Sequence, residues 1–253
     1  GEAKVVPSGG QVQIGYSLYA GPKQEALLVA AGSELRLAIA WGWFEMLARP
    51  FYSALLWFHG WSGSWALAIV LMTLALKLVT FPLANKSYHA MAKMKKLQPE
   101  MEKLKERHKD DQQAMALDMM KLYRDHKVNP LSGCWPMLIQ IPIFFAMYKV
   151  VLLAFEFRHA APGLWPLDYW VIDLSLADPL FVLPVLMGIS MWVQMRLNPP
   201  PTDPAQAMVF QWMPVIFTFM FLWFPAALVW YWLVNNVFSV AQQWWIMKAD
   251  KAV

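Results

Sequence analysis

Charged residues and cysteine are both scarce in this chain. Aspartate, glutamate, lysine and arginine make up 15% of its 253 residues, whereas 58% are hydrophobic. A typical soluble domain carries about 25% charged residues. The one cysteine, Cys134, excludes an internal disulfide and a cysteine-based metal cluster. Because several apolar runs also reach membrane length, the composition predicts an all-α polytopic membrane protein.

Motifs typical of enzymes are also lacking. The sequence contains no HExxH and no glycine-rich phosphate loop. Its five histidines lie outside the apolar stretches or at their ends, so none is placed to activate an intramembrane hydroxyl such as Ser190 or Ser239. We therefore expect no catalytic residue, no metal site and no cofactor. A lysine base paired with a serine keeps an intramembrane hydrolase open as an alternative.

One apolar stretch of membrane length contains a lysine. Residues 65–83 nearly span a hydrocarbon core about 30 Å thick, and Lys77 is their only formal charge. Thr73 and Thr80 lie four residues before and three after it, so the three share one helical face. A lysine at the bilayer centre costs about 2.5 to 3.5 kcal/mol and usually faces a bundle interior or a watery cavity. We interpret this face as the lining of a hydrophilic groove; the alternative is that Lys77 snorkels to the nearer headgroups.

Basic residues concentrate in the next segment. Residues 86–128 hold 11 lysines or arginines against 7 acidic residues, which predicts a cytoplasmic location. Apolar residues at heptad-like spacing, with Asp110 or Asp111 as a helix cap, predict an antiparallel helical hairpin. Its basic, methionine-rich surface could contact a substrate or the ribosome, although a solvated charged face explains the same residues. The candidate contact residues are Met91, Met94, Lys95 and Lys96.

The remaining apolar runs complete a topology of five spans with the C-terminus in the cytoplasm. The spans are expected at 64–84, 130–156, 178–197, 207–224 and 226–247, with an outer loop at 159–177 and a cytoplasmic turn at 198–206. Residues 41–60 are amphipathic and contain Pro50 and charges, so they predict an interfacial helix; a helix packed on a soluble domain is the alternative.

The first 40 residues predict a different kind of structure. Apolar and polar residues alternate over 11–19, QVQIGYSLY, which is typical of a half-buried strand. One strand is not stable by itself. We therefore expect residues 1–40 to be the remnant of a β-rich extramembrane domain.

Polar residues also occur in two later spans. Gln140 lies inside the second span, and Tyr231 and Asn235 lie four residues apart on one face of the last. If these residues meet the Lys77 face, the bundle interior would be hydrated. A lone intramembrane cation also fits a secondary carrier for a small anionic solute. The spans show neither an internal repeat nor a second buried charge, both common in such carriers.

The order of these segments and two long motifs resemble the YidC/Oxa/Alb family of membrane protein insertases. The motifs are KVNPLSGCWPMLIQIPIFFAMY at 127–148 and MPVIFTFMFLWFPAALVWYWLVNN at 213–236. The resemblance covers about residues 41–247. Residues 1–40 resemble the end of the periplasmic domain of the Gram-negative form, whose first transmembrane helix and larger periplasmic part would precede this chain.

The resemblance implies a function and a site. Family members move short polar or acidic segments through a hydrophilic groove that is closed on the outside, and release hydrophobic helices into the bilayer. The implied groove cation is Lys77, and Tyr231 and Trp232 occupy the aromatic positions that contact substrate. Lys77 stands where well-known members have arginine, and Trp232 where they have a second tyrosine. Together with the residues above, the groove candidates are Lys77, Thr73, Thr80, Gln140, Tyr231, Trp232 and Asn235.

The resemblance also implies partners and a location. The partners are nascent membrane proteins, the ribosome, the Sec translocon and the lipid bilayer, with no small-molecule cofactor. The location is the bacterial inner membrane, with a multi-pass topology and a cytoplasmic C-terminus.

Overall fold

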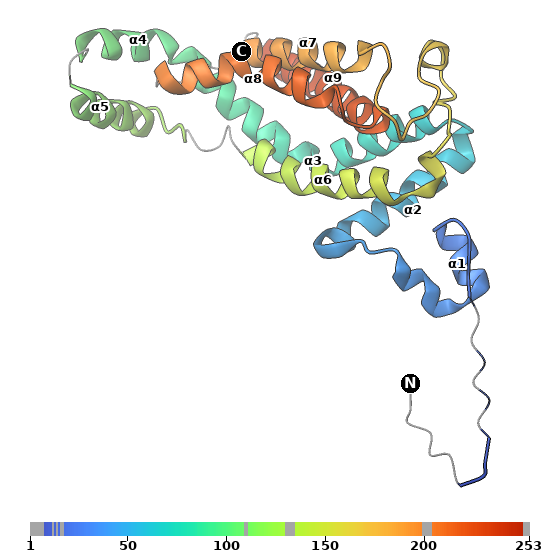
Figure 1. The fold of residues 1–253 in the computed structure, drawn as a ribbon. Coiled ribbons are helices and arrows are strands. Elements are labelled where there is room, and N and C mark those ends of the chain that lie inside the picture. The colour runs from blue at the N-terminus through green and yellow to red at the C-terminus, as the bar shows by residue number, and fades with distance from the viewer. Residues whose placement is uncertain are drawn as a thin grey trace. The chain divides into compact units, whose positions relative to one another are not determined.

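The computed structural model describes residues 8–11, 13, 15, 18–108, 111–129, 135–198 and 204–249. The chain divides into two compact units, Gly1–Ala40 and Trp41–Val253. Figure 1 shows that helices make up most of the described chain. Each unit is described separately below.

The first unit contains two short helices. They are α1, Glu25–Ala31, and the 3-10 helix η1, Ser33–Ala38. The strand expected over 11–19 lies partly outside the described residues, and the described residues of this stretch form no strand. A strand needs the hydrogen bonds of a neighbouring strand, and the described part of this unit offers none.

In the second unit, helix α2, Glu45–Ser62, has one buried and one exposed face. Ala48, Tyr52 and Leu55 are buried and lie at helical spacing, and α2 packs on α3 and α6 through this side. Trp57 and Trp61 are exposed. The helix ends at Gly63, whose φ of 68° lies in the left-handed region that favours glycine.

Helix α3, Trp65–Lys96, is the longest helix of the described chain. Ser64 caps its start by accepting a hydrogen bond from the N–H of Leu67 at 3.1 Å. The sequence places the end of the first span at 84, but the helix continues through Pro82 into the predicted hairpin. Among the described residues, α3 alone is long and apolar enough to cross a membrane; three shorter apolar helices cover Leu138–Leu153, Val182–Leu197 and Ala207–Phe221.

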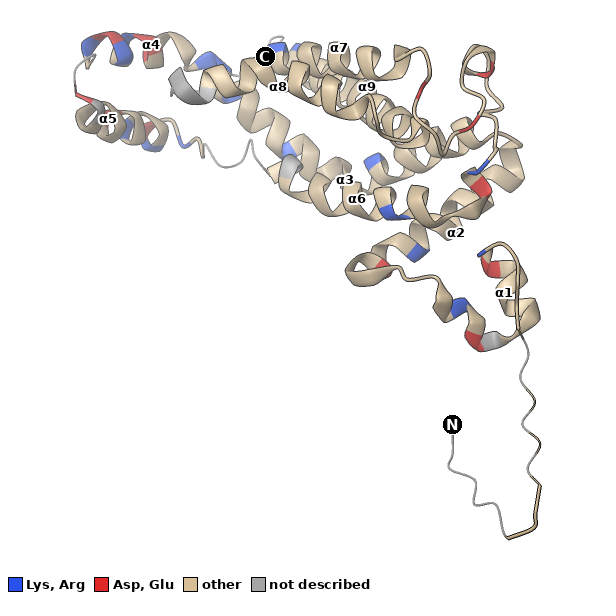
Figure 2. Cartoon of the chain, in the orientation of Figure 1, with Lys and Arg blue, Asp and Glu red and all other residues tan. Residues whose placement is uncertain are grey.

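Helices α4, Gln98–Arg107, and α5, Gln112–Asp125, form a hairpin that follows α3. Lysines and arginines gather on this hairpin and on the adjoining end of α3 (Figure 2). The hairpin has an apolar core of its own, formed by Leu97, Met101, Met119 and Val128.

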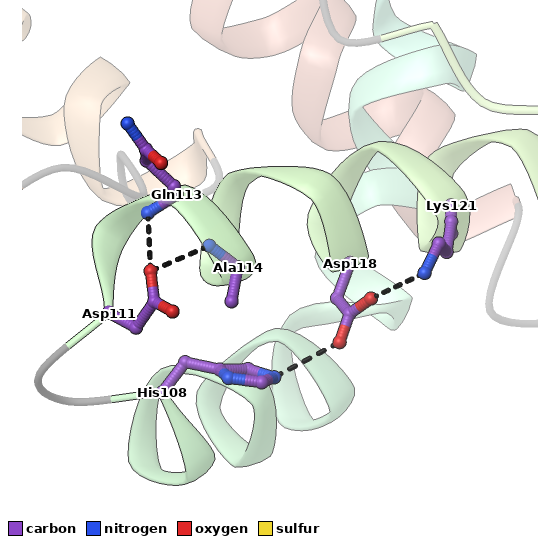
Figure 3. A network of polar contacts seen from close by, with 6 residues as sticks. All are labelled: His108, Asp111, Gln113, Ala114, Asp118 and Lys121. Carbon is purple, nitrogen blue, oxygen red and sulfur yellow. Dashed lines mark hydrogen bonds and ion pairs between the residues drawn. The ribbon is translucent and has the colours of Figure 1, made fainter.

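Polar contacts cap helix α5 and join it to the end of α4 (Figure 3). Asp111 caps α5, because its Oδ1 accepts hydrogen bonds from the N–H groups of Gln113 and Ala114 at 3.0 and 2.9 Å. Asp118 joins both helices: one oxygen lies 3.0 Å from His108 Nε2 and the other accepts from Lys121 Nζ at 3.0 Å. The cap expected from Asp110 or Asp111 is therefore Asp111; Asp110 lies outside the described residues.

Four further helices complete the bundle: α6, Trp135–Leu153; α7, Val182–Leu197; α8, Pro204–Phe221; and α9, Ala226–Ala249. Helix α9 packs against both α3 and α7, and α8 packs against α7 (Figure 1). The absence of a side chain at Gly188 lets α8 approach α7, because a Cβ there would overlap Thr218. Helix α9 therefore lies at the centre of the bundle and contacts helices from both halves of the chain.

The loop between α6 and α7 ties down the starts of two helices. The carbonyl of Pro162 accepts hydrogen bonds from Ser64 Oγ and the N–H of Ala66, both at 3.0 Å. The carbonyls of Leu176 and Leu174 accept from the first N–H groups of α9, at 2.7 and 3.0 Å. The N–H groups at a helix start have no partner within the helix, so these bonds satisfy them and join the loop to α3 and α9.

Two aspartates hold the same loop in shape. Burial would raise the pKa of Asp173, but hydrogen bonds from Ser175 and from the N–H of His159 hold this pKa below its usual value. Asp178 is 1% exposed and accepts a hydrogen bond from the N–H of Leu183, in the first turn of α7, at 2.7 Å. The N-terminal ends of α3, α7 and α9 are thus held by a single loop.

Candidate functional site

A cavity of about 660 Å³ lies between α3, α6, α7, α8 and α9. We call it the bundle cavity. Residues from all five helices line it, and all seven groove candidates from the sequence are among them. Its polar lining residues are Thr73, Lys77, Thr80, Tyr88, Gln140, Gln194, Asn198, Tyr231, Asn235, Asn236 and Ser239.

The side chain of Lys77 crosses to α9. Its Nζ donates a 2.7 Å hydrogen bond to Ser239 Oγ, and Ser239 in turn donates to the backbone carbonyl of Asn235 at 2.8 Å. Among the described residues, Lys77 has no carboxylate partner. The cavity therefore contains a cation that the described part of the chain does not neutralise.

The two threonines beside Lys77 are bonded within their own helix. Thr73 Oγ1 donates to the carbonyl of Ile69 at 2.7 Å, and Thr80 Oγ1 donates to that of Leu76 at 2.8 Å. Each hydroxyl proton is thus engaged, and the oxygens remain as acceptors. Thr73 is only 1% exposed, so it is part of the packed wall of the cavity and offers little surface for direct contact with a bound segment.

The predicted aromatic pair plays two different structural roles. Tyr231 is 1% exposed, and its hydroxyl accepts a 2.9 Å hydrogen bond from Gln140 Nε2, which joins α9 to α6. The ring of Trp232 lies edge-on to Phe144 at 4.9 Å and tilted to Phe221 at 5.6 Å. The indole Nε1 of Trp232 is buried without an acceptor among the described residues.

The rest of the lining is apolar and comes largely from α6 and α8. Phe221 is fully buried and lies within 6.2 Å, centroid to centroid, of four other rings: Phe144, Phe217, Phe224 and Trp232. Five methionines also line the cavity: Met91, Met191, Met195, Met213 and Met220. The cavity therefore has two kinds of lining: the cation and most hydroxyl and amide groups come from α3 and α9, and most of the aromatic and methionine side chains come from α6, α7 and α8.

The hairpin candidates do not form one exposed surface. Met91 is 8% exposed and packs with Tyr88 and Ile246, because α3 continues as a helix alongside α9. Met94 packs on the core of the hairpin. Lys95 Nζ lies 3.4 Å from the carbonyls at the C-terminus of α7, where a cation is favourable. Lys96 lies in the last turn of α3.

Sequence reasoning missed two residues of the cation site, Ser239 and Tyr88. Ser239 lies four residues after Asn235, so helical spacing already placed it on the face of Tyr231 and Asn235. Tyr88 falls in the basic segment and depends on the continuation of α3 past Pro82.

The chemistry of the lining limits what it can bind. The described residues of the lining offer one ammonium, hydroxyls and amides, and include no aspartate, glutamate, histidine or cysteine. Among the described residues, no group of three or more such side chains is placed to hold a metal ion. The bundle cavity can therefore bind an anion and hydrogen-bond to a polar segment, while its aromatic and methionine side chains accept apolar groups.

These features define an α-helical membrane protein with a cation in an interhelical cavity. Comparison of the sequence with known protein families then shows which family the chain belongs to. Residues 57–252 match the 60Kd inner membrane protein family and residues 1–54 match the YidC periplasmic domain. The chain belongs to the 60Kd inner membrane protein family, the YidC family, as its motifs indicated.

Individual relatives support the assignment. A membrane protein insertase YidC from Magnetococcus marinus is 51% identical over 244 residues, which cover 96% of this chain and 43% of the relative. One from Stutzerimonas stutzeri is 46% identical over 252 residues, covering 100% of this chain and 44% of the relative. The chain thus spans less than half the length of these relatives.

A solved structure agrees with the fold. The crystal structure of an active YidC insertase with its first transmembrane domain resolved superposes with a TM-score of 0.62 at 27% identity. The match covers 87% of this chain and 53% of the other. None of these relatives supports the solute-carrier or hydrolase alternatives.

Proposed function

We propose that this chain forms part of a membrane protein insertase. It accepts short polar or acidic segments of nascent proteins into the bundle cavity and releases their hydrophobic helices into the inner membrane, alone or with the Sec translocon. The observation that carries the proposal is Lys77, a cation between helices that has no carboxylate partner among the described residues.

The electrostatic part of the mechanism follows from the position of this cation. Two unit charges 4 Å apart attract by about 4 kcal/mol at an effective dielectric constant of 20, against about 1 kcal/mol in water. An acidic segment entering from water would lose hydration, and Lys77 would offset part of that cost. The hydroxyls and amides of α3 and α9 would supply further hydrogen bonds.

The two kinds of lining suit an amphipathic client. Its polar part would lie against α3 and α9, and its apolar part against the aromatic and methionine side chains. Transfer of that apolar part into lipid stabilises the product by about 0.8 kcal/mol per buried methylene, so the driving force needs no nucleotide. The membrane potential would assist a translocated acidic tail by about 2.3 kcal/mol per charge per 100 mV.

For the topology we propose five spans, formed by α3, α6, α7, α8 and α9, with α2 at the outer interface. Arg196 lies in the last turn of α7, Lys248 lies in the last turn of α9, and the basic hairpin follows α3, so basic residues concentrate on one side (Figure 2). The positive-inside rule then assigns this side to the cytoplasm, with the C-terminus there. The hairpin would meet nascent chains and the ribosome on that side.

Charge reversal at Lys77 tests the proposal. The full-length protein carrying Lys77→Glu should insert an acidic-tailed client about tenfold more slowly, since loss of roughly a third of a 4 kcal/mol attraction is enough for that factor. A client with a neutral tail should be affected little. Lys149→Glu is the matched control, because Lys149 lies on α6 and does not line the cavity. Normal insertion of the acidic-tailed client by Lys77→Glu would contradict the proposal.

A further inference from the structure

We propose that Ser239 is a positioning residue that holds the Lys77 ammonium inside the bundle cavity. The inference rests on the proposed function and assigns to Ser239 the placement of the cation that attracts the client. Ser239 lies on α9, 3% exposed, and receives the 2.7 Å hydrogen bond from Lys77 Nζ.

The hydroxyl of Ser239 is oriented as an acceptor toward Lys77. A serine hydroxyl has one proton to donate and two acceptor positions. The proton is engaged, because Ser239 donates to the carbonyl of Asn235 at 2.8 Å. The oxygen therefore faces Lys77 with its lone pairs.

Without this acceptor, the Lys77 side chain could adopt a different conformation. A long lysine side chain in an apolar span can extend along the helix toward the headgroups. Among the described residues, Ser239 is the hydrogen-bond partner found for Nζ. Ser239 belongs to α9, so the hydrogen bond keeps the ammonium between α3 and α9 and prevents the side chain from extending along α3.

The neutrality of Ser239 matters as much as its position. A carboxylate there would hold the lysine but also cancel its charge, and the cavity would no longer attract an anion. Serine fixes one N–H of the ammonium and leaves the full positive charge. Two N–H groups then remain for the carboxylate of a client, because an ammonium has three donors.

A double-mutant cycle in the full-length protein separates this role from a structural one. Insertion of an acidic-tailed and a neutral-tailed version of one client is measured for Ser239→Ala, Lys77→Gln and the double variant. We expect Ser239→Ala to slow the acidic-tailed client roughly tenfold more than the neutral-tailed client, near the lower end of the range for one hydrogen bond to a charged group. In the Lys77→Gln background the same substitution should have no further effect. Ser239→Thr, which keeps the hydroxyl, should restore insertion.

The outcomes distinguish this inference from the proposed function. If Lys77→Gln slows the acidic-tailed client but Ser239→Ala does not, the role of Ser239 is overturned and the proposed function stands. Equal slowing of both clients by Ser239→Ala, or the same loss in the Lys77→Gln background, would show a packing role and also overturn it. If Lys77→Gln has no effect, the proposed function itself fails. Ser190→Ala is the matched control, because this hydroxyl bonds α9 through Asn236 and does not contact Lys77.

Discussion

Lys77 and Ser239 are 162 residues apart in the sequence, and their side chains meet at 2.7 Å between α3 and α9. The cation site is therefore assembled from the first and the last helix of the bundle. Trp230 joins the same two helices near their N-terminal ends, where its indole Nε1 donates to the carbonyl of Ala66 at 3.0 Å. The site can exist only once α9 has packed on α3.

Replacement of Lys77 by arginine tests whether charge or shape dominates at this position. Arginine keeps the charge and adds a planar fork of donors that binds a carboxylate through two bonds. We expect Lys77→Arg to insert an acidic-tailed client at least as fast as the unchanged protein. Lys77→Met, of similar length but neutral, should be slow in the same assay. Equal rates for the two variants would show that the charge is not used.

The contact between Gly188 and Thr218 should limit what α7 tolerates. A methyl group at Gly188 would overlap Thr218 on α8, so Gly188→Ala should destabilise the protein by about 1 to 3 kcal/mol. The midpoint of thermal unfolding in detergent measures this effect, and Thr218→Ala in the same chain should reverse most of it. Gly60→Ala is the control, because a Cβ at Gly60 meets no atom within 4 Å. A lower midpoint for the control alone would contradict the packing.

Ser64 should stabilise the start of α3 and its link to the loop between α6 and α7. Its hydroxyl accepts from the N–H of Leu67 and donates to the carbonyl of Pro162. Loss of such a cap costs about 1 kcal/mol. Ser64→Ala should therefore speed hydrogen exchange in the first turn of α3 and in residues 160–164, measured by mass spectrometry. Ser53→Ala is the control, because Ser53 is exposed. If Ser64→Ala exchanges no faster than this control, other contacts hold the loop.

The hairpin should lose stability in acid. Hydrogen bonds from Lys121 and His108 lower the pKa of Asp118, so the ionised form is favoured in the folded hairpin. A carboxylate whose pKa is lower when folded stabilises the fold above its unfolded pKa, about 3.9, and loses this contribution as the pH falls through the folded pKa. We expect exchange protection in α5 to fall below about pH 4, relative to the intrinsic rate. Asp118→Asn should weaken this dependence, whereas Asp125→Asn should keep it.

The sequence predicts many of the residues that line the cavity, but few of the contacts that these residues make between helices. Lys77, Thr73 and Thr80 share a face by helical spacing alone, so their common position is local information. The pairing of Lys77 with Ser239 depends on how far α3 is shifted along α9, which no local pattern reports. The sequence pattern also ends the first span at residue 84, whereas the helix continues to Lys96 and packs on α9 there.

The aromatic residues that line the cavity could not be predicted from the sequence either, because no local pattern distinguishes them. In a membrane protein, an aromatic residue that faces a cavity and one that faces lipid satisfy the same hydrophobic pattern. Phe221 is fully buried and Phe219 is 61% exposed, although both belong to the same apolar run. Only the packing of α8 against its neighbours separates them.

Site-specific crosslinking tests the central claim most directly, which is that a client passes beside Lys77. A photoreactive residue is placed in the full-length protein at Thr80 or at Met213, which line the cavity from α3 and α8, and at Leu186, which is 44% exposed on α7 outside the cavity. During synthesis of an acidic-tailed client, we expect crosslinks from Thr80 and Met213 and few from Leu186, and Lys77→Glu should reduce the first two. Equal labelling at the three positions, or labelling at Leu186 alone, would contradict the account.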